Sequence, residues 1–213
     1  TQNTTGHGVT MTSTHSPSFT NLTINNTAGS GVKGTTVTNF TFKNGTINNS
    51  GTGAGVDESN IAFNAQSAGT EKNLDGVVTI TDNVLTNSLY HGVDIFNFDG
   101  TQSNLTVSRN TLTSSTSAAS SLGSAIRIVA FGSASTVANI TKATLDANVI
   151  TNFPTGSGIL FNCGNANGAG TGGTCGTPGS GTNLVTITNT RVTGQASPNQ
   201  LGSSAIVASL TGG

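Results

Sequence analysis

The sequence contains no tryptophan, one tyrosine and few charged residues, which make up 7% of its 213 residues. An ordinary soluble domain carries about 25% charged residues, so this chain lacks the means to build a thick aromatic core under a charged surface. Disorder usually accompanies high net charge and few β-branched residues, whereas here the net charge is -1 and Val, Ile and Thr are frequent. The composition therefore indicates an ordered fold that needs little apolar volume per residue.

The same scarcity excludes several functional classes. Seven Lys and Arg residues form no basic patch for nucleic acid or an anionic membrane, and no apolar run reaches the length of a membrane span. No basic and then apolar segment opens the sequence, so no signal peptide is predicted in it. His7, His15 and His91 are too far apart in the repeat described below for a metal site, and we predict neither a metal nor a cofactor.

Cysteine is almost absent. The two cysteines, Cys163 and Cys175, both lie in one Gly-rich stretch. A disulfide that closes a small loop is the favoured interpretation, and it indicates an oxidising compartment. Two free thiols in a loop are the alternative.

What the chain has in abundance is a short repeated unit of an apolar residue, a threonine and a second apolar residue, with the period of a strand that buries one face. A turn position follows three residues later, and it is occupied by Asn83, Asn110 and Asn148 in three copies. Another apolar residue comes two positions further on in every copy but the first, which has Gly29 there. The six copies are Leu22-Thr23-Ile24, Phe40-Thr41-Phe42, Val78-Thr79-Ile80, Leu105-Thr106-Val107, Ala143-Thr144-Leu145 and Val185-Thr186-Ile187.

A second strand follows in each unit, generally after Gly or Ala, and the spacing between these strands is unequal. Two short strands and a corner cannot bury an apolar face alone, but stacked copies can. We therefore predict an all-β fold for residues 1–213, a right-handed parallel β-helix of about six or more rungs with variable loops. The second strands begin at Val32, Val56, Val93, Ile126, Ile159 and Ile206, and the loops are expected at 60–76, 114–123, 132–139 and 164–183.

In such a stack, like residues form columns. Asn83, Asn110 and Asn148 are expected at one corner, where their side-chain amides bond along the stack. A β-sandwich is the main competing fold. It predicts more equal strand spacing and Asn-Gly hairpin turns that recur with the repeat, whereas Asn44-Gly45 does not recur in the other copies of the unit.

Two segments carry a family resemblance: VTITDNVLTNS at 78–88 and LTVSRNTLTSS at 105–115, each followed by a Gly- or Ala-led apolar strand. They resemble the parallel β-helix repeats of the pectin-lyase-like superfamily, and the resemblance covers about residues 19–210. It implies the fold. It leaves the function open, because that superfamily includes polysaccharide lyases, glycosidases, phage tailspikes, autotransporter passengers and surface adhesins, and a fold does not decide a function.

One alternative function is a polysaccharide-cleaving enzyme. On the second strands, the position after the leading residue reads Lys33, Asp57, Asp94, Arg127, Leu160 and Val207. Asp57, Asp94 and Arg127 are expected on successive rungs, where paired carboxylates suit acid and base chemistry. The competing interpretation is that Asp94 and Arg127 merely neutralise each other.

The most regular outward feature is the threonine column, which we predict as a binding surface. A flat Thr array also suggests ice binding, as a minor alternative, but the neighbouring column contains Lys43 and Asp146, whose charges interrupt such an array. The column is expected to contain Thr23, Thr41, Thr79, Thr106, Thr144 and Thr186.

The leading functional prediction is a non-catalytic structural or adhesive module, extracellular or on a cell surface. No capping element is recognisable at either end of the repeat array, and solenoid ends normally carry caps. We therefore expect either a segment of a longer solenoid or a fibre subunit that stacks end to end on itself. The other expected partners are carbohydrate or a host surface.

Overall fold

The computed structural model describes residues 6–52, 58–66, 69–114, 123–133, 135–153, 156–164, 174–175, 185–194 and 204–210. Within this part every regular element is a strand. The strands form three sheets, named A, B and C here, and the chain visits them in the repeating order B, C, A. The neighbours within each sheet run parallel, which establishes the predicted parallel β-helix and excludes the antiparallel sandwich.

Each sheet takes its strands from successive turns of the chain. Sheet B contains β1 (Val9–Thr12), β4 (Val32–Thr35), β7 (Ile61–Phe63), β10 (Val93–Asn97), β13 (Ile126–Ala130), β17 (Ile159–Cys163) and β21 (Ile206–Leu210). Sheet C contains β2 (Ser18–Thr20), β5 (Val37–Lys43), β8 (Leu74–Thr81), β11 (Gly100–Ser108), β14 (Ala138–Ile140), β15 (Ala143–Asp146), β18 (Thr174–Cys175) and β19 (Val185–Thr188). Sheet A contains β3 (Thr23–Thr27), β6 (Thr46–Ser50), β9 (Val84–Thr86), β12 (Thr111–Thr113), β16 (Val149–Thr151) and β20 (Arg191–Thr193).

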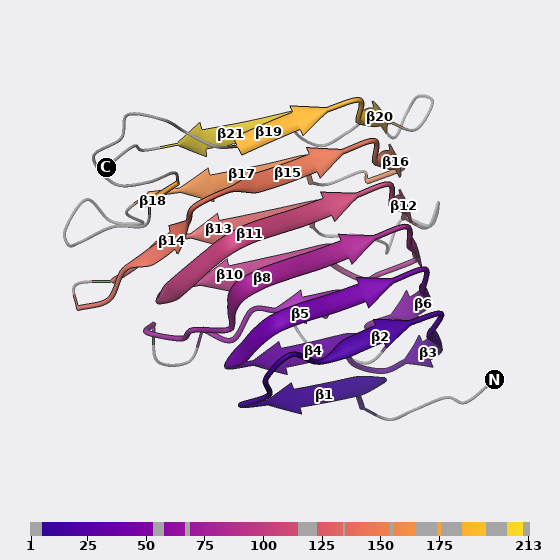
Figure 1. The fold of residues 1–213 in the computed structure, drawn as a ribbon. Coiled ribbons are helices and arrows are strands. Elements are labelled where there is room, and N and C mark those ends of the chain that lie inside the picture. The colour runs from indigo at the N-terminus through magenta and orange to yellow at the C-terminus, as the bar shows by residue number, and fades with distance from the viewer. Residues whose placement is uncertain are drawn as a thin grey trace.

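Each rung passes once through each sheet, so the described strands form six rungs and the first strand of a seventh. In the fifth and sixth rungs the sheet C segment is divided into two strands, β14 with β15 and β18 with β19. In Figure 1 the chain climbs from β1 at the bottom to β21 at the top, running left to right on the near side and right to left on the far side. This sense of winding is right-handed, as parallel strand connections nearly always are.

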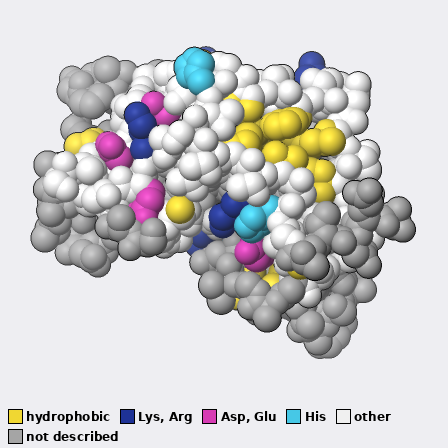
Figure 2. Space-filling model, turned by 90° about the horizontal axis from the view of Figure 1, so that it is seen from below, with side chains coloured by type: hydrophobic (Ala, Val, Ile, Leu, Met, Phe, Trp, Pro, Cys, Tyr) yellow, Lys and Arg dark blue, Asp and Glu magenta, His cyan; other side chains and the backbone are white. Residues whose placement is uncertain are grey.

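The interior consists of columns of apolar side chains, one residue per rung. On sheet A the column is Ile24, Ile47, Leu85, Leu112, Ile150 and Val192, and on sheet C it includes Phe40, Val78, Leu105, Ala143 and Val185. Figure 2, which looks along the stack from the side of β1, shows hydrophobic side chains gathered at this end of the molecule. Because the cross-section is narrow, a hydrophobic content of 33% is sufficient to fill it.

A close approach between rungs occurs at Gly34. The ring of Phe63 lies over this glycine, and a Cβ at position 34 would be only 2.2 Å from Phe63 Cε1. The same ring packs edge-on against Phe40, with centroids 4.8 Å apart. A glycine in one rung therefore makes room for the large aromatic side chain of the next.

The corner between sheets C and A has the same backbone conformation in all six rungs. Its first residue has a positive φ, between 48° and 62°, in every case. Asn and Asp tolerate this left-handed region better than other non-glycine residues, and they fill four of the six positions. The residues are Asn21, Asn44, Asp82, Arg109, Ala147 and Asn189.

The structure corrects the first predicted unit. Ser18 of β2, not Thr23, pairs with Thr41, and Thr23 lies on sheet A opposite Thr46. The copy that belongs to sheet C is therefore Pro17-Ser18-Phe19, and the apolar residue expected five positions after it is Ile24. Gly29 is therefore no exception to the repeat pattern. It seemed to be one because the first unit was placed five residues too late in the sequence.

The third rung required a second correction. Its sheet B strand begins at Ile61, which pairs with both Val32 and Val93, and not at Val56. The predicted loop at 60–76 was wrong in consequence, since it contains β7 and the start of β8. The predicted loop at 132–139 is confirmed up to its last two residues, where β14 begins at Ala138. The predicted loops at 114–123 and 164–183 fall largely outside the described residues.

Candidate functional site

The predicted asparagine column forms a continuous hydrogen-bonded ladder at the corner between sheets C and A. Asn83 Nδ2 donates to Asn110 Oδ1 at 2.9 Å, and Asn110 Nδ2 donates to Asn148 Oδ1 at 3.1 Å. The backbone N–H groups of Asn83 and Asn110 donate to the same two oxygens. All three side chains are buried, so the ladder satisfies the polar backbone at the corner.

A second ladder, at the corner between sheets A and B, was missed in the sequence. Its residues are His7, Ser30, Ser59, His91, Ser124 and Ser157. The side chain of each of the first five accepts the backbone N–H of the ladder residue in the next rung, through a serine hydroxyl or through histidine Nδ1. The signal was present, because each of these residues stands two positions before the first residue of a sheet B strand.

The two histidines replace serine in this ladder and need extra room. A Cβ at Gly29 would be 2.4 Å from His7 Nδ1, and one at Gly123 would be 2.4 Å from His91 Cε1. Each imidazole thus covers a glycine of the next rung. His7 and His91 act as backbone acceptors, a role that the sequence analysis did not assign to them.

Of the predicted catalytic residues, the structure brings Asp94 and Arg127 together. Arg127 binds both carboxylate oxygens of Asp94, through Nε at 2.6 Å and through its Nη2 atom at 2.7 Å. The Asp94 side chain is inaccessible to solvent, while 17% of the Arg127 side chain is exposed. Mutual neutralisation therefore describes this pair, and Asp94 has no solvent-exposed surface with which to meet a polymer.

Asp57 lies outside the described residues. The position assigned to it, opposite Asp94 in the neighbouring rung, belongs to Ala62. The prediction that the third rung presents a carboxylate at this position was therefore wrong, and it follows from the misplaced strand at Val56. Among the described residues, the third-rung position opposite Asp94 thus holds an alanine and not a carboxylate.

Two further side chains complete a polar row on the outer face of sheet B. Asn64 Nδ2 donates to Asp94 Oδ2 at 2.6 Å, and Lys33 Nζ donates to Asn64 Oδ1, also at 2.6 Å. Asn64 is 4% exposed. The guanidinium of Arg127 also lies 5.4 Å from the ring centroid of Phe96. The row Lys33–Asn64–Asp94–Arg127 thus spans four consecutive rungs.

The outer face of sheet C presents the threonine column. Thr41, Thr79, Thr106, Thr144 and Thr186 pair in register across five rungs. Their side chains are partly or fully exposed, and no described segment crosses the front of this sheet in Figure 1. The predicted alignment is confirmed for these five residues and was wrong for Thr23, which lies on sheet A. That the column binds a ligand stays a prediction.

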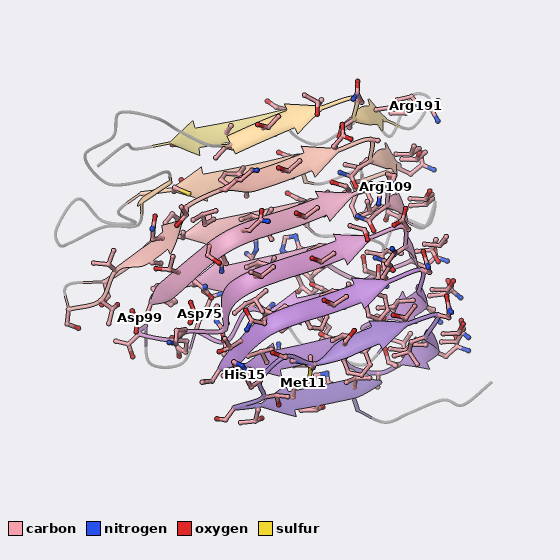
Figure 3. All side chains as sticks on the ribbon, in the orientation of Figure 1. Met11, His15, Asp75, Asp99, Arg109 and Arg191 are labelled. Carbon is pink, nitrogen blue, oxygen red and sulfur yellow. The ribbon has the colours of Figure 1, made fainter. Side chains whose placement is uncertain are left out.

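Charged groups occupy the edges of this face and the column beside the threonines. Figure 3 shows Asp75 and Asp99 on the left and Arg109 on the right, with short side chains between them. The neighbouring column reads Thr20, Lys43, Thr81, Ser108, Asp146 and Thr188. Asn25, which directly follows the misplaced unit Leu22-Thr23-Ile24, pairs with Asn48 on sheet A and is not part of this column. The face is therefore polar, with isolated charges.

An exposed row of charges follows the edge of sheet C near the asparagine ladder. Arg109 binds Asp82 through Nε at 2.6 Å, and this bond lowers the pKa of the Asp82 carboxyl. Hydrogen bonds from Thr188 and then Asn189 lower the pKa of Asp146. These groups lie in water, so salt weakens their interactions.

Cys163 is buried at the end of β17, and Cys175 ends β18, where it pairs with Ile140 of β14. The part of the chain that the structure describes contains no free cysteine. The side chain of Cys175 lies outside that part. The disulfide between the two residues stays a prediction.

No family model matches this chain, and no curated protein and no solved structure shows significant similarity to it. Within the described ranges, no group of three or more His, Cys, Asp or Glu side chains is placed to hold a metal ion. Those ranges also contain no helix long and apolar enough to cross a membrane. The functional argument therefore depends on the geometry of the two outer faces.

Proposed function

We propose that the chain is a non-catalytic structural and adhesive β-solenoid module of an extracellular or cell-surface protein. The observation that carries this proposal is the in-register threonine column on the face of sheet C that no described segment covers. Parallel strands hold successive threonines about 4.8 Å apart. Rows of hydroxyl groups at a fixed spacing can donate and accept hydrogen bonds, which suits a hydroxyl-rich polymer such as a polysaccharide.

The buried ion pair favours this role over a polysaccharide-cleaving enzyme. A general acid must reach the bond that it protonates, whereas Asp94 is fully buried and bound by Arg127. A relationship to the surface adhesins of the pectin-lyase-like superfamily is part of this proposal. It is supported by the parallel coil and by the repeat segments quoted above.

The test compares retention of the purified chain on a panel of insoluble and arrayed polysaccharides for two variants. Thr106→Arg places a bulky side chain in the middle of the threonine column. Thr111→Arg places the same side chain on sheet A, at an exposed position. We expect wild-type retention on at least one glycan, an at least tenfold loss for Thr106→Arg, and no change for Thr111→Arg.

Equal retention of both variants would assign binding to another face. Measurements of ice growth in the same preparations cover the minor alternative, since a thermal hysteresis removed by Thr106→Arg would identify ice as the ligand. Release of soluble fragments from any polysaccharide would contradict the non-catalytic part of the proposal.

The predicted disulfide supports the extracellular location, because disulfides persist in oxidising compartments. We expect the folded, non-reduced chain to take up no iodoacetamide, and peptide mapping to recover Cys163 joined to Cys175. Uptake of two alkyl groups without a reductant would show free thiols and remove this support.

A further inference from the structure

The polar row on sheet B places an amine, a carboxamide and a carboxylate in sequence. Lys33 Nζ is 2.6 Å from Asn64 Oδ1, and Asn64 Nδ2 is 2.6 Å from Asp94 Oδ2. A carbonyl bond is about 1.2 Å long, so Nζ lies within about 4 Å of the carboxamide carbon. This separation is close to that of groups held ready to react, about 3–3.5 Å.

The stack itself brings these groups together. Lys33 and Asp94 both pair with Ala62, on the rungs below and above it. Ala62 fills little space, and Asn64, two residues further along the same face, spans the gap between the two charged side chains. Asn64 and Asp94 are 4% and 0% exposed, so bulk water is largely excluded from the carboxamide.

We propose that Lys33 and Asn64 form an intramolecular isopeptide bond, which would link the second and third rungs covalently. The uncharged amine of Lys33 attacks Cγ of Asn64, the Nζ–Cγ bond forms and the Cγ–Nδ2 bond breaks. One proton passes from Nζ to Nδ2, and ammonia leaves. The step consumes no oxidant or other reactant, and its products are a secondary amide and one ammonia.

Asp94 is placed to carry that proton, because its Oδ2 is hydrogen-bonded to the nitrogen that leaves. Arg127 holds the carboxylate through two bonds and fixes its orientation. Effective concentrations of well-oriented groups are very high, which is what the attack of an amine on an unreactive amide requires. The bond would close the loop between Lys33 and Asn64 and resist separation of the two rungs under force.

Intact mass spectrometry of the reduced and denatured chain tests the proposal. After incubation of the folded chain at mildly alkaline pH, we expect the wild type to be lighter than its sequence mass by one ammonia. Proteolysis should recover a cross-linked fragment that joins the peptides containing Lys33 and Asn64. Lys33→Arg, which keeps the charge and the hydrogen-bonding reach, should have its full sequence mass.

Two more variants complete the design. Lys72→Arg, at an exposed lysine paired with Asp75, should still show the loss of ammonia. Asp94→Asn should abolish it, or slow it at least tenfold, if circular dichroism shows that the variant folds; if the variant does not fold, Lys33→Arg decides alone.

Three outcomes would overturn the proposal. One is a wild-type chain that keeps its full sequence mass throughout the incubation. The second is a loss of ammonia that persists in Lys33→Arg, which would come from succinimide formation at an asparagine. The third is a loss of one water with Lys33 joined to Asp94.

Discussion

At the scale of single residues, the fold depends on side chains that accept backbone N–H groups at the corners of the coil. Two of the three corners carry ladders of this kind, one of asparagine and one of serine and histidine. A corner interrupts the regular sheet, and its buried N–H groups need other partners. The ladders supply them without charge, which is consistent with a chain that has few ionisable residues.

Substitution of Asn110 should destabilise the coil because it breaks the asparagine ladder in the middle. Asn110→Ala removes the acceptor for two N–H donors of Asn83 and the donor to Ile80 O. An unsatisfied buried group costs about 1–3 kcal/mol, so we expect a loss of roughly 2–4 kcal/mol in urea unfolding. Asn104→Ala, at an exposed position of β11, the strand that precedes this corner, is the control. An equal loss of stability in both variants would show that the ladder does not stabilise the coil.

The contact between His91 and Gly123 should be visible as coupling between two substitutions. Gly123→Ala would place a Cβ 2.4 Å from the imidazole, and such overpacking costs about 1–3 kcal/mol. In a His91→Ser background, where the ladder has its commoner residue, the same change should cost much less. Thermal unfolding of the four proteins in a double-mutant cycle measures this coupling, and additive effects would contradict the packing described here.

At the scale of elements, each strand contributes one residue to each column, so features of the surface run along the stack. Asp82, Arg109 and Asp146 follow one another at the edge of β8, β11 and β15. Arg109 is exposed and the two carboxylates are partly exposed, and an isolated ion pair at the surface contributes little. The contribution of the row is expected to be modest and to depend on pH.

Acid should weaken this row in a defined window. The folded pKa values of Asp82 and Asp146 lie below their usual range, because Arg109 and Thr188 respectively bond to the ionised forms. Their stabilising contribution is therefore complete above the unfolded value, about 3.9, and is lost as the pH falls through the folded values. We expect the melting temperature of Asp82→Asn/Asp146→Asn to depend less steeply on pH below about 4 than that of the wild type. Parallel curves, at low salt, would mean that these bonds do not persist in solution.

At the scale of the whole molecule, each rung contacts only its neighbours, so stability is close to a sum of nearest-neighbour terms. Strands such as β8 and β11 pair on both sides, and they should open last. Native-state hydrogen exchange of the isolated chain should give the slowest amides in β8 and β11 and faster ones toward β1 and β20. Uniform protection would instead indicate a single cooperative unit.

The sequence alone was sufficient for the architecture and for much of the surface. Alternation in units such as Val78-Thr79-Ile80, a recurring Asn three positions later, and unequal insertions together predicted a parallel coil, the asparagine ladder and five of the six column threonines. These features can be predicted from the sequence because strand alternation and turn type depend on residues that are close together in the chain.

Only the tertiary structure decided which sheet each strand joins. Leu22-Thr23-Ile24 has the same alternation as the true units, yet β3 belongs to sheet A, and Val56 looked as suitable as Ile61 for the third rung. The physical reason is that a period of two is common to all three sheets, whereas register is set by hydrogen bonds to the rungs above and below. For the same reason the meeting of Lys33, Asn64 and Asp94, and the replacement of serine by His91, became visible only once the rungs were stacked.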